Sequence, residues 1–332
     1  MNDQPELAML WESADPAEEL PRRFGFADAA AAVGWLSELL RERWAVRLRG
    51  CARIMLSDRN ALALLETDAG PMVAKWSAAS AHFPRLGALA EVTSRLGRQA
   101  LPVAAPVPTR DGQVQVQIDS ASIALQPRID GTHLDVGDAE QVRAAGQVLA
   151  RLHRALAESA PADLPELSAP ISLSAQLRSW LASGPRHVPA DVVGALGAVV
   201  AASPIEPDTP IQLVHGDFRA ANVLCRGSEV VAVIDFDDAR LDHRVVELAR
   251  SAALLGTVYH HWAPVSPEVH GTFLAGYQAV SPLTAAESAW LRPLVAWYSA
   301  RLAPPGGDPA GWAVSAREVL AAPQEVYSAS VT

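Results

Sequence analysis

The sequence has few of the features that mark secreted, membrane or metal-binding proteins. Cys51 and Cys225 are its only cysteines among 332 residues, and their wide separation fits no metal or redox spacing. We therefore expect reduced thiols and a cytoplasmic protein. No hydrophobic run is long enough to span a membrane, so we expect no membrane partner. The N-terminus, Met1 to Glu19, is acidic and lacks the cationic start of a signal peptide.

Positive charge, and lysine above all, is also scarce. Lysine and arginine together number 27 against 37 acidic residues, which gives a formal net charge of -10 at pH 7. This balance argues against a nucleic acid as partner and favours a cationic small molecule. Lys75 is the only lysine. In a chain that otherwise uses arginine, a lone lysine marks a position that needs a compact ammonium, and a solvated surface residue is the alternative.

The most informative segment begins and ends in short apolar runs that each lead into polar residues. The run 211–214 precedes a His-Gly-Asp triplet that ends at Asp217, with Asn222 five positions later. The run 230–234 precedes Asp235. An Asp that orients a hydroxyl, with an Asn and a second Asp to hold Mg²⁺, is the layout of a phosphoryl-transfer site. The triplet alone could be a turn, but the complete set at this spacing favours a site.

Hydrophobic periodicity and turn chemistry predict the remaining elements. A helix is expected from Asp28, as N-cap, to Trp44, and others over 83–99 and 138–158. The sequence predicts strands over 46–56, 61–67, 71–76, 113–118 and 122–126, and a proline-rich loop over 163–170. Lys75 ends the third of these strands, in the sequence Met-Val-Ala-Lys, which is similar to the Val-Ala-Ile-Lys strand of kinases.

These elements predict an α+β protein with two lobes. Residues 1–126 would form a nucleotide-binding lobe with a small antiparallel β-sheet and an extra N-terminal helical segment. Residues 127–131 would form a hinge, because Pro127 and Gly131 break the pattern. Residues 132–332 would form a helical lobe for catalysis and substrate binding. A nucleotide would lie in the cleft between the two lobes.

With these motifs, the chain resembles the aminoglycoside phosphotransferase family of antibiotic and metabolite kinases over about residues 46–301. The resemblance is most specific at His-Gly-Asp-x-x-x-x-Asn over 215–222 and Val-Ile-Asp-Phe-Asp-Asp over 233–238. Weaker matches are Leu-Ala-Arg-Leu-His over 149–153 and Glu-Leu-Ala from Glu247. The resemblance implies a protein-kinase-like fold and transfer of a phosphoryl group from ATP or GTP, with Mg²⁺, to a hydroxyl group.

The resemblance also implies roles for the residues of the central segment. Asp217 would be the catalytic base or hydroxyl-orienting group, and Asn222 and Asp235 would be the Mg²⁺ ligands. Arg219 would stabilise the negative charge that develops on the transferred phosphoryl group. His215, two residues before the catalytic Asp, would be structural and support the loop.

The nucleotide would be bound mainly by residues of the first lobe. Lys75 would contact the phosphates and pair with Glu91, the only acid on the following helix. No glycine-rich phosphate loop is present, so the turn 57–60 would supply polar contacts instead. The segment 126–129 would bind adenine through its backbone. The residues assigned to the nucleotide are Lys75, Glu91, Ser57, Asn60, Gln126, Arg128 and Ile129.

Residues for the substrate are expected among the C-terminal acids and aromatic rings. Asp238, Trp262 and Trp297 are the candidates, although helical spacing makes core packing the default for the tryptophans. Asp237, like Asp238, could face the substrate, join the metal shell or be solvated. Asp242 and Glu247 are expected to hold loops by hydrogen bonds to backbone or arginine. A metal site formed by the histidines is not expected, because the spacing of His260, His261 and His270 matches no known type.

The sequence leaves the substrate open. We expect an antibiotic, so that the protein would confer resistance or self-resistance. A primary-metabolite kinase for homoserine, choline or a sugar is the alternative within enzymes, and a nucleotide-binding pseudoenzyme is the alternative outside them. The sequence is equally compatible with a monomer and a dimer.

Overall fold

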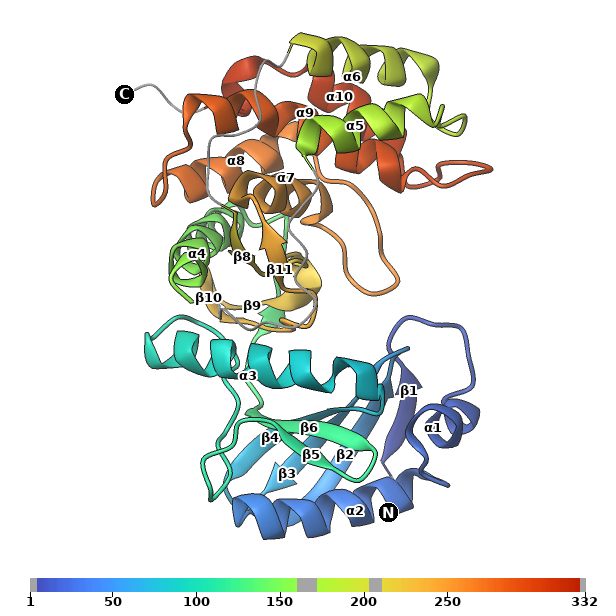
Figure 1. Ribbon diagram of the computed structural model, residues 1–332, viewed down its shortest axis with the longest axis vertical. Coiled ribbons are helices and arrows are strands. Elements are labelled where there is room, and N and C mark those ends of the chain that lie inside the picture. The colour runs from blue at the N-terminus through green and yellow to red at the C-terminus, as the bar shows by residue number, and fades with distance from the viewer. Residues whose placement is uncertain (1–4, 160–171, 203–210, 329–332) are drawn as a thin grey trace. The chain divides into compact units, whose positions relative to one another are not determined.

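The computed structural model describes residues 5–159, 172–202 and 211–328 and divides into two compact units (Figure 1). The first unit ends at Asp130 and the second begins at Gly131. The proline-rich loop expected over 163–170 lies outside the described residues.

A six-stranded sheet with the order β1-β2-β3-β4-β6-β5 forms the first unit. Short turns join β2 to β3 and β3 to β4, and these strands pair antiparallel, as predicted. β6 pairs antiparallel with β4 and with β5. β1 is an addition that pairs parallel with β2, so the sheet is mixed and the prediction of an antiparallel sheet was wrong at this edge. The elements are β1 Glu6–Met9, α1 Pro16–Phe24, α2 Ala29–Leu39, β2 Leu48–Leu56, β3 Asn60–Thr67, β4 Gly70–Ser77, α3 Phe83–Arg98, β5 Val116–Ile118 and β6 Ala121–Pro127.

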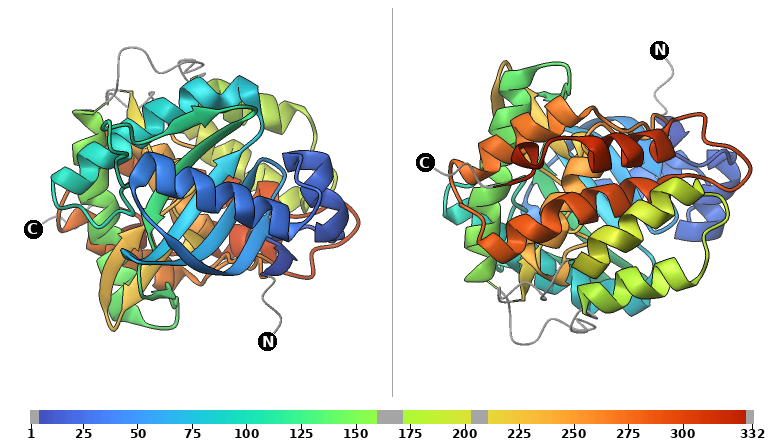
Figure 2. Two further views of the ribbon diagram at one scale, coloured as in Figure 1. Left: turned by 90° about the horizontal axis from the view of Figure 1, so that it is seen from below. Right: turned by 90° about the horizontal axis from the view of Figure 1, so that it is seen from above.

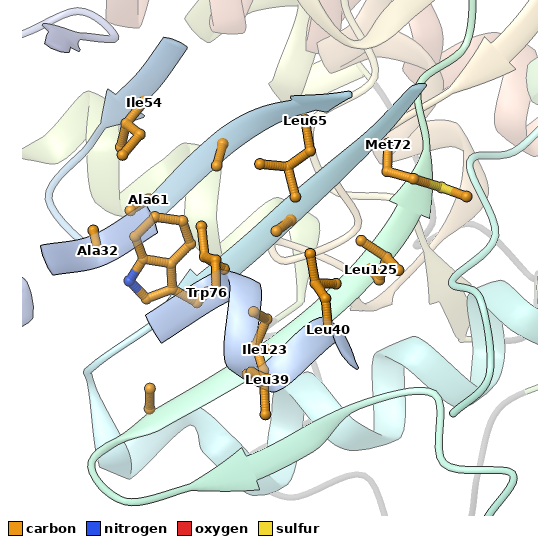
Figure 3. Close-up of a cluster of buried hydrophobic side chains, with 14 of the residues drawn as sticks. Ala32, Leu39, Leu40, Ile54, Ala61, Leu65, Met72, Trp76, Ile123 and Leu125 are labelled. Atoms are coloured by element: carbon orange, nitrogen blue, oxygen red, sulfur yellow. The ribbon is translucent and has the colours of Figure 1, made fainter. Parts of the chain in front are cut away.

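The core of the first unit lies between α2 and one face of this sheet. Asp28 caps α2, because its carboxylate accepts the N–H of Ala31 at 2.8 Å, and a π-helical turn extends the helix to Trp44. Figure 2 (left) shows α2 lying across the strands. Figure 3 shows Leu39 and Leu40 directed at the same buried cluster as Trp76 of β4. This burial fixes which side chains of each strand face α2.

The second unit is mainly helical, as predicted. Two small sheets, with orders β10-β9-β7 and β11-β8, accompany the helices. Figure 2 (right) shows α9 and α10 beside α5 and α6. The elements are β7 Thr132–His133, α4 Ala139–Ala157, α5 Leu173–Ala182, α6 Ala190–Ala202, β8 Gln212–Val214, β9 Val223–Arg226, β10 Glu229–Val233, β11 Arg240–Asp242, α7 Arg244–Leu254, α8 Pro267–Gln278, α9 Ala285–Leu302 and α10 Trp312–Ala321.

Two local predictions for this unit are confirmed, the cap at Asp138 and the burial of Trp297. Asp138 is the N-cap of α4 and accepts the N–H groups of Glu140 and Gln141. Trp297 of α9 is almost completely buried, in agreement with core packing as the default for its helical spacing. In the part of the chain that the structure describes, no helix has both the length and the apolar character that crossing a membrane requires.

Candidate active site

The loop that carries Asp217 follows β8, whose three residues are all buried. Gly216 has a φ of +87°, in the left-handed region that favours glycine. A Cβ atom at this position would lie 2.0 Å from the carbonyl oxygen of Asp238. The glycine of the His-Gly-Asp motif is therefore required both for the backbone turn and for the close approach of the segment around Asp238.

The carboxylate of Asp217 is held by three side chains. Its Oδ2 accepts hydrogen bonds from Nε of Arg219 at 2.9 Å and from Nδ2 of Asn222 at 2.8 Å. Its Oδ1 accepts one from Nη2 of Arg250 at 3.2 Å. The side chain is only 15% exposed, which strengthens these charge-assisted bonds. The three partners fix the carboxylate in one orientation.

Hydrogen bonds between main-chain and ring atoms join the two halves of the central segment. The carbonyl oxygen of Asn222 accepts the N–H of Ile234 at 3.0 Å. Nδ1 of His215 accepts the N–H of Asp217, so Nε2 carries the ring proton and donates to the carbonyl oxygen of Ile234 at 3.0 Å. Asp235, which is exposed, follows Ile234 directly and has a φ of +64°. Asp217, Asn222 and the strand end that precedes Asp235 thus come together, as the spacing predicts.

The side-chain oxygen atoms of this segment are of the kind that binds Mg²⁺. The amide nitrogen of Asn222 donates to the carbonyl and to the carboxylate of Asp217, both at 2.8 Å, which leaves its amide oxygen as the atom for a metal. Asp235 offers a carboxylate. Mg²⁺ prefers such hard oxygens and is commonly bound by one or two protein groups together with phosphates. No group of three or more His, Cys, Asp and Glu side chains that could hold a metal occurs within residues 5–159, 172–202 and 211–328.

Glu247, one turn into α7, anchors the backbone of the loop. Its Oε2 accepts the N–H of His215 at 2.8 Å and lies 2.8 Å from Nε2 of His153, while its Oε1 accepts the N–H of Gly216. Burial alone would raise the pKa of Glu247, but the hydrogen bond from His153 and the nearby positive charges lower that pKa to about 2. The expected loop-holding role of Glu247 is confirmed, and Asp242 likewise accepts the N–H of His243.

Arg250 was missed by the sequence interpretation. It lies three residues after Glu247 on α7 and donates to the carbonyl oxygen of Gly216 and to the carboxylate of Asp217. The spacing of i and i+3 places Glu247 and Arg250 on one face of the helix. That spacing, next to the Glu-Leu-Ala match, was the available signal. The negative carboxylate of Glu247 accepts backbone N–H groups of the loop, and the positive guanidinium of Arg250 donates to its oxygen atoms.

Arg219 is enclosed by the loop that follows α7. It is 8% exposed, and its Nη1 donates to the carbonyl oxygen of Thr257 at 3.4 Å. The centre of its guanidinium lies 5.3 Å from the ring centroid of Trp262, a cation–π contact. Trp262 itself is 45% exposed and donates from Nε1 to the carbonyl oxygen of Tyr259. An exposed aromatic ring therefore lies against the arginine that contacts Asp217.

The other substrate candidates have different surroundings. Trp297 is 2% exposed, so burial removes it from the residues that a substrate could reach, and we correct that prediction. Asp238 is exposed. His270 is buried with Nδ1 at 3.0 Å from the hydroxyl of Tyr327.

In the first unit, Lys75 is partly buried on β4, where its Cα lies opposite those of Leu62 and Ala124. Its neighbours Ala74 and Trp76 belong to the core cluster. Because successive side chains of a strand alternate, Lys75 points to the face of the sheet away from α2. Glu91 is exposed on α3. The phosphate contact of Lys75 and its pairing with Glu91 stay predictions.

The turn between β2 and β3 is closed by its own residues. The N–H of Ser57 donates to the carbonyl oxygen of Asn60 at 2.8 Å, and the N–H of Asn60 donates to Oγ of Ser57 at 3.0 Å. At the end of β6, the N–H of Arg128 donates to the carbonyl oxygen of Pro71 at 3.1 Å, and its guanidinium pairs with Glu66 at 3.0 Å. The nucleotide contacts assigned to the turn, and those assigned to Gln126, Arg128 and Ile129, stay predictions.

Comparisons with known proteins agree with this geometry. The model of the phosphotransferase enzyme family matches residues 57–294. The homoserine kinase of Gluconobacter oxydans (strain 621H) is 31% identical over 189 residues, which cover 56% of this chain and 59% of that protein. The homoserine kinase of Pseudomonas aeruginosa (strain LESB58) is 27% identical, with 60% of this chain and 62% of that protein covered. The matched part thus spans about three-fifths of the length of these relatives.

Solved structures with the same fold include several antibiotic and metabolite kinases. The macrolide 2′-phosphotransferase of Brachybacterium faecium has a TM-score of 0.57 at 18% identity, with 87% of this chain and 98% of that chain covered. Spectinomycin phosphotransferase in complex with ADP and spectinomycin has a TM-score of 0.56 at 16% identity, with 89% and 96% covered. A microcompartment-associated aminopropanol kinase has a TM-score of 0.54 at 20% identity, with 89% and 95% covered.

These likenesses show an α+β, protein-kinase-like fold, as the sequence predicted. The family model covers well over half of the chain and includes the whole segment from Asp217 to Asp235. The chain belongs to the phosphotransferase enzyme family.

Proposed function

We propose that this protein is a kinase that transfers the γ-phosphoryl group of ATP to a hydroxyl group of a small molecule. The observation that carries the proposal is the set of contacts around Asp217. Among the hydrogen bonds from described residues, Oδ2 accepts two and Oδ1 accepts one. A carboxylate oxygen has two lone pairs, so Oδ1 can still accept a hydrogen bond from a substrate hydroxyl.

In this mechanism Asp217 orients the attacking hydroxyl and accepts its proton as the phosphoryl group is transferred. Catalysis of this kind depends mostly on positioning and on charge neutralisation. Arg219 and Arg250 hold the carboxylate in place. Asn222 and Asp235 would hold Mg²⁺, which would neutralise charge on the phosphates.

The nucleotide is proposed to be bound through the first unit. The compact ammonium of Lys75, on the sheet face away from the α2 core, would contact the phosphates. ADP is bound in the solved spectinomycin phosphotransferase, which supports an adenine nucleotide as co-substrate here. The closed turn from Ser57 to Asn60 would lie against the phosphates in place of a glycine-rich loop.

For the acceptor, we propose a small amino alcohol, with homoserine as the first candidate. The curated relatives with 26–31% identity are homoserine kinases. The formal net charge of -10 would attract an ammonium group, and the exposed carboxylate of Asp238 is the candidate partner for it. The exposed ring of Trp262 offers a second surface for a cation or an apolar group.

The test is a panel of amino alcohols, sugars and antibiotics incubated with the protein and MgATP or MgGTP, with detection of phosphorylated products by mass spectrometry. Phosphorylation of homoserine or a related amino alcohol supports the proposal. Phosphorylation of an antibiotic alone would replace the proposed acceptor by the class expected from the sequence, with a role in resistance. Nucleotide binding without any product would favour a pseudoenzyme.

A further inference from the structure

We propose that Tyr277 is a positioning residue for the catalytic loop. Its hydroxyl acts through His153 and Glu247 to fix the backbone before Asp217 and so directs the carboxylate of Asp217. The inference rests on the function proposed for Asp217.

Three consecutive hydrogen bonds connect Tyr277 to the loop. The hydroxyl of Tyr277, which is completely buried on α8, lies 2.8 Å from Nδ1 of His153 on α4. Nε2 of His153 lies 2.8 Å from Oε2 of Glu247, which is 1% exposed on α7. Glu247 then accepts the backbone N–H groups of His215 and Gly216. Three helices are thereby joined to the residue that precedes Asp217.

The chemistry of the carboxylate sets the direction of the hydrogen bonds at Glu247. An ionised carboxylate only accepts, so the N–H groups of His215 and Gly216 and Nε2 of His153 all donate to Glu247. The other ring nitrogen of His153, Nδ1, lies 2.8 Å from the hydroxyl of Tyr277, which can donate or accept in this bond. Hydrogen bonds that follow one another in a chain polarise one another, which strengthens these buried bonds. Loss of the hydroxyl would leave Nδ1 of His153 buried without its partner.

Tyr277, at the end of this connection away from the loop, is itself held in place. Arg244 of α7 hydrogen-bonds the side chain of Tyr277 and pairs with Glu287 at 2.6 Å. Glu287 is buried and forms a capping box with Thr284 at the start of α9. The helices α4 and α8 touch, because a Cβ atom at Gly276 would lie 2.2 Å from the carbonyl oxygen of Arg143. Tyr277 therefore has little freedom to move away from His153.

The chain contains a matched control for this residue. Tyr327 is also completely buried, and its hydroxyl lies 3.0 Å from Nδ1 of the buried His270. Within the described residues, no hydrogen bond joins His270 or Tyr327 to the loop from His215 to Asp217. Tyr327→Phe thus removes the same group from the same kind of pair without touching the proposed connection.

The experiment compares Tyr277→Phe with Tyr327→Phe by amide hydrogen exchange of a peptide that covers residues 213–218. We expect Tyr277→Phe to speed exchange of the His215 and Gly216 amides about tenfold, because His153 and Glu247 are then held less firmly and the hydrogen bonds of both amides to Glu247 weaken. Tyr327→Phe should leave their exchange unchanged. With an acceptor from the panel, Tyr277→Phe should lower kcat about tenfold through misplacement of Asp217, while KM for ATP stays the same.

Exchange in Tyr277→Phe that matches the wild type, or that rises equally in Tyr327→Phe, would overturn the inference. The exchange measurement needs no turnover, so it judges Tyr277 even if no acceptor is phosphorylated. If Tyr277→Phe does not fold, His153→Gln interrupts the same connection and is judged by the same peptide. Faster loop exchange in His153→Gln supports the inference, and unchanged exchange overturns it.

Discussion

Replacing Glu247 by Gln tests the anchor of the catalytic loop with a change of one atom. In the wild type, Oε2 accepts two donors and Oε1 accepts one, all of them buried. A glutamine has one acceptor oxygen, so at least one buried N–H faces the amide NH₂ group. An unsatisfied buried donor costs about 1–3 kcal/mol, and loss of the charge adds to this.

The pKa of Glu247 gives a second route to the magnitude. A decrease from 4.5 to about 2 corresponds to roughly 3 kcal/mol of stabilisation, at about 1.4 kcal/mol per pH unit. Both routes predict that Glu247→Gln lowers the free energy of unfolding by about 3 kcal/mol at pH 7. Urea denaturation measures this, with Glu42→Gln as a surface control that should change stability by less than about 0.5 kcal/mol.

The dependence on pH separates this explanation from a simple packing defect. Because folding lowers the pKa, Glu247 stabilises the protein fully above pH 4.5, and the contribution is lost as pH falls from 4.5 towards 2. The difference between wild type and Glu247→Gln should therefore shrink across this window. A difference that stays constant below pH 4.5, or one as small as that of Glu42→Gln at pH 7, would refute the role of the ionised carboxylate.

Three further predictions concern the proposed reaction. Asp217→Asn should lower turnover by about 10²–10⁴-fold with nucleotide affinity largely retained, and activity within a few-fold of wild type would remove Asp217 from the mechanism. In calorimetry, Asp235→Ala should weaken Mg²⁺-dependent nucleotide binding more than Asn222→Ala, because a carboxylate gives a hard cation a full charge; equal affinities would contradict this. Lys75→Arg should keep its thermal stability and lose turnover, because a forked guanidinium does not replace a point charge; normal turnover would make Lys75 an ordinary surface residue.

The sequence predicted those parts of the fold that depend on local pattern. The cap at Asp28 and the strand over 61–67 depend on neighbouring residues, and both are confirmed. The strand β1 was not predicted, because Glu6–Met9 is only four residues long and depends on parallel pairing with the distant strand β2. The two-residue strand β7 was not predicted, because it forms by pairing with β9, about 90 residues later in the chain.

The candidate site shows the same division between local and distant information. The spacing from Asp217 to Asn222 assigned both residues to one site, and in the structure a hydrogen bond joins their side chains. Arg250 contacts Asp217 from 33 residues away; its i and i+3 spacing from Glu247 indicates a shared helix face but not this partner. Sequence pattern could not separate exposed Trp262 from buried Trp297, because exposure depends on what other segments cover.

The central claim, transfer of a phosphoryl group to a substrate hydroxyl, is tested most directly with ATP labelled by ¹⁸O in its γ-phosphoryl group. The acceptor from the panel is incubated with wild type and with Asp217→Asn, and the label is followed by mass spectrometry. We predict that the wild type places the labelled phosphoryl group on the acceptor in step with ADP formation, and that Asp217→Asn does not. Label found only in inorganic phosphate, or equal transfer by both proteins, would contradict the account.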